Sequence, residues 1–394
     1  MMISSLARLP EHLDIAIVGG GPVGAALALA LCDSGLAVAV LEARSEPVGA
    51  DPRGLALSYG SIDALDKLGV WRQIGDGTAI ETVHVSQRDG FGHATLSCDE
   101  LRLPALGYVV NYSSLARACE QALQDGPCHY VTGVALDEIK LLSGYAALRV
   151  RQGGEVRLLT AGLVVVADGG KGLTQLPGIE RREHDYGQHA IVCNVRSDKP
   201  HRGVAYERFD VDGPMALLPH GDGFALVWTR DSAVAPEWLA LTDEVFIERL
   251  QQAFGDRAGR FVGAGPRVAF PLALKRLVQP VTTRTALIGN AAQVLHPVAG
   301  QGANLGLRDA LDLALEIKAC PRGEIGNSDM LQRYQRRRAR DVTATTAFTD
   351  SLIKLFGLHG SLLSTARGTG LVALDLLPAA RRRFTQHMVF GSGK

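Results

Sequence analysis

The feature that most constrains this chain is a glycine-rich segment directly after a short apolar run near its N-terminus. Residues 14–18 are mostly branched apolar side chains, which predict a buried strand. A GxGxxG pattern at Gly19, Gly21 and Gly24 follows, and the small residues 25–32 predict a helix. A strand, a tight glycine turn and a helix in this order begin a βαβ unit that binds dinucleotides. The sequence therefore predicts a Rossmann-like domain.

The residues after this helix complete the unit and restrict its ligand. Residues 37–41 predict a second buried strand, which ends at Glu42. A carboxylate at this position accepts hydrogen bonds from ribose hydroxyls and disfavours a 2′-phosphate, so FAD or NAD fits and NADP does not. We also expect Arg44, close to the same strand end, to contact the cofactor.

Composition argues against several classes of function. Lysine plus arginine and aspartate plus glutamate number 41 each, so no excess of positive charge favours nucleic acid. The six cysteines form no CxxC pair, which argues against a zinc site and a dithiol redox centre. No apolar run reaches the roughly 18 residues that span a bilayer, and residues 1–10 are too weakly apolar for a secretory signal. We therefore expect no metal, no nucleic-acid partner and a cytoplasmic location.

Two further segments favour FAD over NAD. Residues 163–167 predict a buried strand, and Asp168 follows at the end where open α/β sheets bind ligands. Residues 285–288 predict another strand, and segment 297–302 of the loop after it cannot form regular structure. A helix is expected from residue 303, so the loop would present backbone amides to an anion. The expected anion is the N1/C2 edge of a flavin, which gains negative charge on reduction.

Three stretches of the sequence together resemble one known family. They are GGGPVG at 19–24, VVVADGG at 164–170 and LIGNAAQVLHPVAGQGANLGLRD at 287–309. The chain is similar over nearly its whole length to the group A FAD-dependent aromatic monooxygenases of the p-hydroxybenzoate hydroxylase type. Within that family it most resembles the ubiquinone-biosynthesis branch, above all the 2-polyprenyl-6-methoxyphenol hydroxylases. Further stretches that agree are residues 51–58, 206–209, 213–219, 226–228, 270–272, 333–338 and 348–352.

The resemblance implies cofactor contacts for individual residues. The family usually has Gly-Asp where this chain has Gly289 and Asn290, and an asparagine forms hydrogen bonds without adding charge. Asn290 is therefore expected to contact the cofactor and not to act as a catalytic acid. The expected FAD contacts are Gly19, Gly21, Gly24, Glu42, Arg44, Arg53, Arg117, Asp168, Gly289, Asn290, Pro297, Gly300, Gly302 and Asn304.

The resemblance also implies the reaction. NAD(P)H would reduce the FAD and leave, reduced flavin would take up O2 as a C4a-hydroperoxide, and an electron-rich phenol would be hydroxylated. The implied substrate is a lipophilic polyprenylated phenol of the 2-polyprenyl-6-methoxyphenol type in ubiquinone biosynthesis. Three alternatives stay open. They are hydroxylation of another ubiquinone ring position, hydroxylation of a soluble aromatic acid bound by Arg208 or Arg230, and a non-oxygenating flavin reductase or scaffold of the same fold.

The substrate is expected between the flavin and a second sheet. Residues 178–277 alternate apolar and polar side chains in short runs, which predicts an antiparallel sheet over the flavin. His220 is a candidate for phenol deprotonation because histidine titrates near neutral pH, although its place beside a Gly-Asp-Gly turn favours a structural role. His296 is a second candidate, with a structural hydrogen bond in its loop as the alternative. The expected catalytic residues are thus His220, His296 and Pro297, and the expected substrate contacts are Leu218, His220, Phe224 and Trp228.

The expected fold class is α/β with an α+β substrate domain and C-terminal helices. Apolar clusters between Leu352 and Leu363, followed by Arg381–Arg383, suit helices that pack on their own domain. Peripheral contact with the inner face of a membrane is the alternative; a ubiquinone-biosynthesis complex and the oligomeric state stay open. The expected domains are a discontinuous FAD-binding domain at 12–75, 100–177 and 278–325, a substrate sheet domain at 76–99 and 178–277, and a helical region at 326–394.

Overall fold

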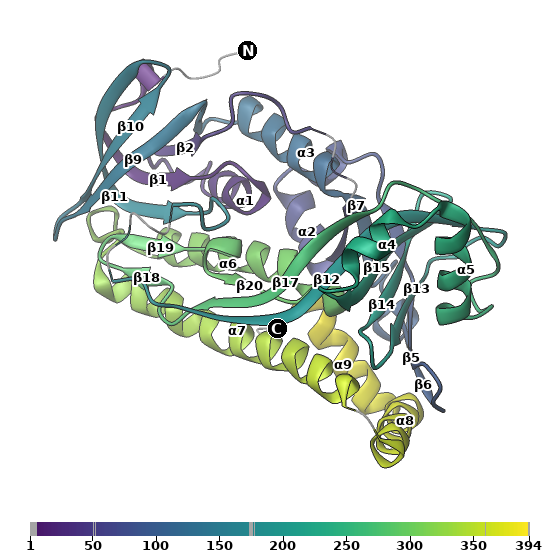
Figure 1. The fold of residues 1–394 in the computed structure, drawn as a ribbon. Coiled ribbons are helices and arrows are strands. Elements are labelled where there is room, and N and C mark those ends of the chain that lie inside the picture. The colour runs from purple at the N-terminus through teal and green to yellow at the C-terminus, as the bar shows by residue number, and fades with distance from the viewer. Residues whose placement is uncertain are drawn as a thin grey trace.

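The first of two large sheets has a parallel core and includes the predicted βαβ unit (Figure 1). The computed structural model describes residues 6–49, 51, 53–172, 176, 178–358 and 360–392. The core strands are apolar along most of their length because both faces of the sheet are covered. In sheet order they are β8 (His129–Thr132), β2 (Val38–Glu42), β1 (His12–Val18), β11 (Glu155–Val166) and β19 (Thr285–Leu287).

Helices cover one face of this sheet and a β-arm covers the other. Ile15 and Ile17 of β1 pack against the helical side, whereas Ala16 and Val18 pack against the arm. This alternation follows from the two-residue period of a strand. The covering helices are α1 (Pro22–Ala30), α3 (Tyr112–Asp125) and α6 (Gln301–Lys318), and the arm consists of β9 (Val134–Leu141), β10 (Ala146–Gln152) and the first half of β11. The short strand β18 (Val281–Thr282) pairs with β19 at the sheet edge.

The second large sheet is antiparallel except where β13 pairs in parallel with β5. One face packs on α4 (Ala235–Ala240) and α5 (Asp243–Phe254), and the other faces the parallel sheet and C-terminal helices (Figure 1). The predicted mixed α/β fold is thereby confirmed. Its strands, in order, are β20 (Gln293–Val294), β17 (Val268–Leu277), β12 (Arg181–Ser197), β15 (Gly223–Asp231), β14 (Met215–His220), β13 (Val204–Phe209), β5 (Thr82–Gln87) and β6 (His93–Ser97), with β16 (Phe261–Ala264) beside β12.

A small three-stranded sheet lies between these two parts. Its strands β3 (Gly54–Ser58), β7 (Gly107–Asn111) and β4 (Thr78–Ile80) contact β14 of the second sheet, and β3 also contacts α6. Helix α2 (Tyr59–Lys67) begins directly after β3, where the Ser58 hydroxyl caps it by accepting a hydrogen bond from the backbone N–H of Ser61. This small sheet gives the second sheet a fixed position relative to the glycine loops.

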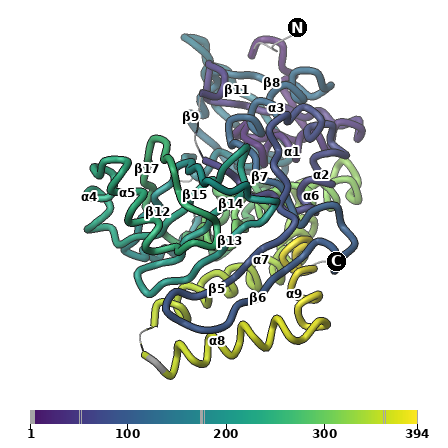
Figure 2. The backbone as a smooth tube through the Cα atoms, turned by 90° about the vertical axis from the view of Figure 1, so that its right-hand side faces the viewer, coloured from purple at the N-terminus to yellow at the C-terminus, as the bar shows by residue number. Residues whose placement is uncertain are grey.

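Three C-terminal helices close the molecule on one side. The long helix α7 (Ser328–Gly357) packs against α6, and α8 (Ser361–Leu376) and α9 (Pro378–Phe390) lie beside β5 and β6 (Figure 2). Between residues 6 and 392, wherever the structure is described, none of the helices is both long and apolar enough to cross a membrane.

Candidate active site

A single continuous cavity of about 1210 Å³ lies where the two large sheets and the C-terminal helices meet. Glu42, Gly19, Asp168 and Gly289 line it, each just at or after the carboxyl end of a parallel strand. The strand order reverses between β1 and β11, which is the position where open α/β sheets bind ligands. The second sheet forms the opposite wall.

In the glycine turn after β1, one glycine leaves space for a ligand. The other two allow parts of the protein to pack closely against each other. A Cβ on Gly24 would lie 2.1 Å from the carbonyl oxygen of Gly19, so only glycine lets α1 approach the turn. Gly19 has a φ of +106° and packs on Ala167. A Cβ on Gly21 would meet nothing within 4 Å, because Gly21 faces the cavity. Gly19 and Gly21 line the cavity, as expected of cofactor contacts, but Gly24 does not, because it packs against the turn; the contact predicted between Gly24 and FAD is therefore not supported.

Glu42 and Arg44 lie together at the end of β2. The Glu42 carboxylate accepts hydrogen bonds from the backbone N–H groups of Gly20 at 2.7 Å and Arg44 at 2.9 Å. It also pairs with the Arg44 guanidinium at 3.0 Å. Both side chains line the cavity, so a carboxylate and a cation are available where the ribose of the cofactor was expected.

Asp168 lies in the predicted turn after β11 and faces the same space. Its carboxylate accepts hydrogen bonds from the backbone N–H groups of Gly170 at 2.8 Å and Gly172 at 2.5 Å. These bonds hold the side chain at the crevice between the strand ends.

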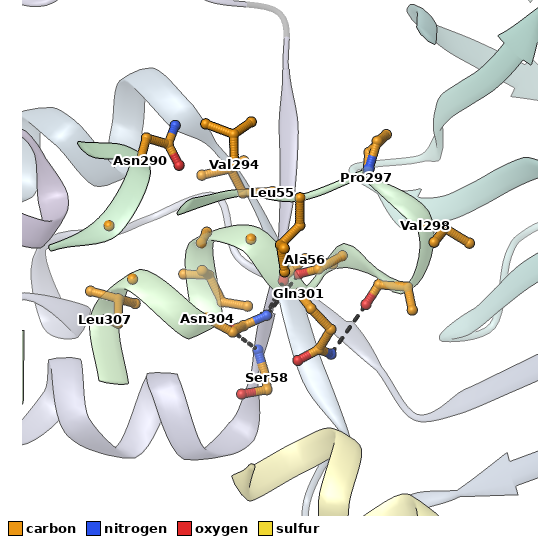
Figure 3. A pocket seen from close by; sticks show the side chains of 18 of the residues that line it. Leu55, Ala56, Ser58, Asn290, Val294, Pro297, Val298, Gln301, Asn304 and Leu307 are labelled. Carbon is orange, nitrogen blue, oxygen red and sulfur yellow. Dashed lines mark hydrogen bonds between the residues drawn. The ribbon is translucent and has the colours of Figure 1, made fainter. Parts of the chain in front are cut away.

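The third glycine-rich segment forms a loop of two short 3-10 turns, Gly289–Ala291 and Val298–Gly300, which leads into α6 (Figure 3). Ala299 and Gly300 have φ values of +61° and +60°, and Gly300 is the N-cap of the helix. Asn290, Pro297 and Gly302, which were expected to contact FAD, line the cavity. The helix begins at Gln301 and not at residue 303, so Gly302 lies in its first turn.

Asn304 lines the cavity, but its amide forms hydrogen bonds within the protein (Figure 3). The amide oxygen accepts from the Ser58 backbone N–H and the Ser61 hydroxyl, both at 2.8 Å. The amide nitrogen donates to the carbonyls of Ala56 at 3.0 Å and Gly300 at 2.9 Å. Asn304 thus joins the loop to β3 and α2, a positioning role that the sequence did not reveal.

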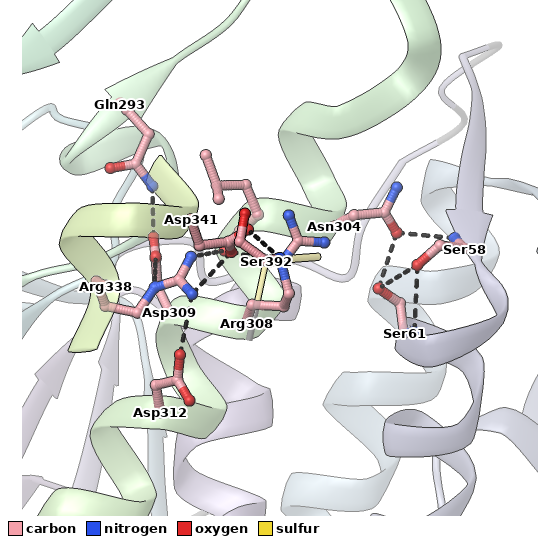
Figure 4. A network of polar contacts seen from close by, with 11 residues as sticks. Ser58, Ser61, Gln293, Asn304, Arg308, Asp309, Asp312, Arg338, Asp341 and Ser392 are labelled. Atoms are coloured by element: carbon pink, nitrogen blue, oxygen red, sulfur yellow. Dashed lines mark hydrogen bonds and ion pairs between the residues drawn. The ribbon is translucent and has the colours of Figure 1, made fainter. Parts of the chain in front are cut away.

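A buried charge network behind the loop was also missed (Figure 4). The Asp309 carboxylate accepts from the Gly289 backbone N–H at 3.0 Å, the Gln293 amide at 2.5 Å and the Arg338 guanidinium at 2.7 Å. Arg338 of α7 also pairs with Asp341 at 2.9 Å. Burial opposes ionisation of Asp341, but Arg308 and Arg338 outweigh it and lower its pKa to about 2. The network fixes α7 against the start of the loop.

The other two predicted arginine contacts, Arg53 and Arg117, lie in different places. Arg53 lines the cavity, where it forms an ion pair with Asp51 at 2.6 Å and lies over the rings of Tyr112 and Phe270. Arg117 is exposed on the outer side of α3, away from the cavity, and donates to Ser114. The prediction for Arg117 is therefore wrong, because Leu115 presents the cavity face of that helix and residues two apart point in different directions.

Leu218 is the one predicted substrate contact on the second sheet that the structure places in the cavity. Phe224 and Trp228 on β15 point to the opposite face, where Trp228 packs on Trp238 with ring centroids 4.6 Å apart. Val227 of the same strand lines the cavity instead. The predictions for Phe224 and Trp228 are wrong by strand parity, since neighbouring residues face opposite sides.

Neither candidate histidine lines the cavity. His220 ends β14 at the turn to β15, as the structural alternative expected. His296 is 1% exposed, accepts a hydrogen bond from the Val298 backbone N–H at 3.1 Å and meets the ring of Tyr186 edge to face. Burial lowers the pKa of His296 to about 4. The catalytic role predicted for both histidines is not supported, whereas Pro297 does line the cavity.

One acidic residue that the sequence analysis did not identify faces the space expected to hold the substrate. Glu207 of β13 lines the cavity between the second sheet and the glycine loop, and burial raises its pKa to about 8. Arg208 donates to the Ala253 carbonyl, and Arg230 lies over Trp238, so neither cation faces the cavity.

Comparison with known proteins agrees with this geometry. A family model described as an FAD binding domain matches residues 12–349. The chain is 34% identical over 385 residues to ubiquinone hydroxylase UbiL of Rhodospirillum rubrum, with 95% of this chain and 89% of that protein covered. It is 33% identical over 390 residues to 3-demethoxyubiquinol 3-hydroxylase of Escherichia coli, with 95% and 97% covered.

A solved structure shows the same fold. The p-nitrophenol 4-monooxygenase PnpA from Pseudomonas putida superposes with a TM-score of 0.79 at 17% identity, with 97% of this chain and 99% of that chain covered. The resemblance read from the sequence is confirmed: this chain belongs to the FAD-dependent aromatic monooxygenases, in the branch that contains the ubiquinone-biosynthesis hydroxylases.

Proposed function

We propose that this protein uses FAD, NAD(P)H and O2 to hydroxylate a polyprenylated phenol of the 2-polyprenyl-6-methoxyphenol type in ubiquinone biosynthesis. The observation that carries the proposal is the continuity of the cavity. The glycine loops that suit FAD and an apolar compartment among α7, α8 and α9 line the same space. An aromatic ring beside the flavin can therefore extend its tail between the helices.

The residues of the first sheet fit FAD. Gly21 leaves backbone exposed at the start of α1, whose N-terminus favours a pyrophosphate. Glu42 and Arg44 would hold the ADP half, Arg53 would approach the pyrophosphate or the flavin, and the loop at 297–302 would hold the ring. When bound, FAD supplies hydride acceptance from NAD(P)H and activation of O2, and the protein supplies position and a dry surrounding.

The compartment among the C-terminal helices suits an isoprenoid tail. Each buried methylene contributes about 0.8 kcal/mol to binding. Arg367 is the only cation of α8 that lines this compartment. One of its guanidinium nitrogens donates hydrogen bonds to the carbonyls of Leu355 and Leu358 at the end of α7. The apolar lining includes Phe348, Leu352, Leu371, Leu374, Phe384 and Met388.

The test is stopped-flow absorbance of the FAD-loaded protein. The flavin is reduced anaerobically and mixed with oxygen, with and without a short-chain 2-prenyl-6-methoxyphenol. We expect a transient flavin–oxygen absorbance band whose decay coincides with the formation of hydroxylated product. Direct reoxidation to hydrogen peroxide without product would overturn it in favour of a reductase or scaffold.

Hydroxylation of a soluble aromatic acid finds less support. Such a substrate would need a cation beside the ring, and Arg208 and Arg230 both face away from the cavity. Comparison of a prenylphenol with 4-hydroxybenzoate in the same assay separates the two. A carboxylated substrate that stimulates NAD(P)H oxidation more strongly would favour the soluble alternative, and the ring position follows from the product's mass spectrum and NMR.

We also propose that the outer side of α8 contacts an anionic lipid surface from which such a substrate is taken. The leucines Leu362 and Leu376 are 84% and 71% exposed on α8, and the exposed basic residues Lys354, Arg382 and Arg383 flank it. Sedimentation with phosphatidylglycerol vesicles should fall several-fold in Leu362→Ser/Leu376→Ser. The control Leu158→Ser alters a leucine that is 69% exposed on β11. Equal sedimentation of all three proteins would refute the contact.

A further inference from the structure

Glu207 directs a carboxyl group into the part of the cavity that suits a substrate ring. On β13, Ala205, Glu207 and Phe209 line the cavity, while Tyr206 between them packs on Phe254 on the opposite face. Strand alternation therefore sets the direction of the Glu207 side chain.

The surroundings of this carboxyl are apolar. Its neighbours in register are Val85 on β5 and Ala216 on β14, and both line the cavity. Burial raises the pKa of this carboxyl to about 8, and the nearby backbone N–H of Ala299 in the glycine loop offsets only part of that shift. Glu207 is thus held beside the loop that suits the flavin ring, with no ion-pair partner among the described residues.

The other titratable groups around it point elsewhere. On β5, His84 faces the opposite side of the sheet and stacks on His93. On β14 and the loop, His220 and His296 do not line the cavity, and Arg367 is bound to the end of α7. The remaining charged residues that line the cavity are Glu42, Arg44, Arg53, Asp168 and Lys171, all on the wall formed by the first sheet and β3.

We infer that Glu207 is the catalytic residue that accepts the proton of the substrate's phenol group, an inference that rests on the proposed function. The phenol O–H bond breaks, its proton forms an O–H bond with the Glu207 carboxylate, and the electron pair stays on the phenolate oxygen. The phenolate makes the ring more electron-rich for attack on activated oxygen. The carboxyl releases the proton again to the product oxygen or to water.

The raised pKa makes this transfer less costly. An ordinary glutamate titrates near pH 4 and a phenol such as tyrosine near pH 10. A carboxyl with a pKa of about 8 lies much closer to the phenol, and proton transfer is most effective when the two values approach each other.

The test measures ionisation of a bound phenol directly. The probe is 2-methoxy-4-nitrophenol, whose phenolate absorbs visible light, bound to the oxidised FAD holoenzyme between pH 6 and 9. Wild type is compared with Glu207→Leu, which neither accepts nor donates a proton, with Glu207→Asp, and with the control Glu248→Leu on the exposed side of α5. Flavin absorbance and the melting temperature show that each variant is folded and loaded.

The expected result is that the ionisation midpoint of the bound probe lies at least one pH unit higher in Glu207→Leu, with Glu207→Asp in between. Hydroxylation of the prenylphenol should fall about 100-fold or more in Glu207→Leu and stay unchanged in Glu248→Leu. Identical probe titrations and hydroxylation rates in all four proteins would overturn the role of Glu207. The proposed function would still stand in that case, because the wild-type protein would form hydroxylated product. Probe ionisation that depends on Glu207, without any hydroxylated product from wild type, would overturn the proposed function alone.

Discussion

The two walls of the cavity are specified in different ways. The wall expected to hold FAD is built from backbone: Gly24 admits α1, and Gly21 exposes the chain. The wall expected to hold the substrate is built from alternate side chains of β13, β14 and β15, such as Glu207 and Leu218. A change in the first wall should act through geometry, whereas a change in the second should act through one side chain and its direction.

The glycine turn offers the sharpest test of the backbone wall. Gly24→Ala should abolish FAD retention and destabilise the apoprotein by roughly 1–3 kcal/mol, because its Cβ would overlap the Gly19 carbonyl. Gly21 has a φ of −67° and open space where a Cβ would lie. Gly21→Ala should therefore weaken FAD binding without loss of apoprotein stability. Flavin fluorescence titration and thermal unfolding without FAD measure the two effects. Equal destabilisation by both substitutions would break the distinction.

The network behind the glycine loop should carry a large part of its stability. Arg338→Met leaves Asp309 buried without its cation, which is expected to cost about 3–5 kcal/mol. Lys67→Met removes an exposed partner of Asp63 and should cost less than about 1 kcal/mol. Urea unfolding of both variants decides the point. A small loss in Arg338→Met would show that the loop does not depend on α7.

His296 should make the loop sensitive to acid. Its pKa of about 4 lies below the ordinary value near 6.5, so the unfolded chain binds more protons between these values. Its contribution is complete above pH 6.5 and is lost as the pH falls toward 4, at about 1.4 kcal/mol per pH unit. In His296→Asn, which keeps an acceptor for the Val298 N–H, the loss of unfolding free energy between pH 6.5 and 4.5 should be about 2 kcal/mol smaller. An unchanged pH dependence would contradict a buried neutral histidine.

Strand parity predicts which face of the second sheet affects the substrate. Leu218→Ala should raise the KM for a prenylphenol several-fold, because Leu218 lines the cavity. Trp228→Phe should lower stability and leave KM within about twofold, since Trp228 packs on α4 and α5. Steady-state kinetics and thermal unfolding separate the two. A larger KM effect from Trp228→Phe would reverse the assignment of the faces.

The smallest effect is expected at His220. His220→Gln should leave kcat and its pH profile within about twofold of wild type, because this side chain lies at a turn outside the cavity. Initial rates between pH 6 and 9 are sufficient. Loss of one limb of the pH profile would restore His220 as the proton acceptor in place of Glu207.

The sequence predicted the backbone wall well because glycine spacing reports backbone geometry directly. It failed on the second sheet because β15 is apolar on both faces, from Phe224 to Trp228, so no two-residue pattern shows which side faces the cavity. The sequence did not identify Glu207, because two adjacent charged residues, Glu207 and Arg208, do not indicate which of them faces the cavity. It missed the pair of Asp309 and Arg338 because residues 29 positions apart meet only after α6 and α7 pack.

The origin of the oxygen atom in the product decides whether this protein hydroxylates a prenylphenol with O2. The FAD-loaded protein is supplied with NAD(P)H and a 2-prenyl-6-methoxyphenol under isotopically heavy oxygen gas, and the product is analysed by mass spectrometry. We expect a hydroxylated product that carries one heavy oxygen atom. Consumption of NAD(P)H with heavy hydrogen peroxide and an unchanged phenol would contradict it.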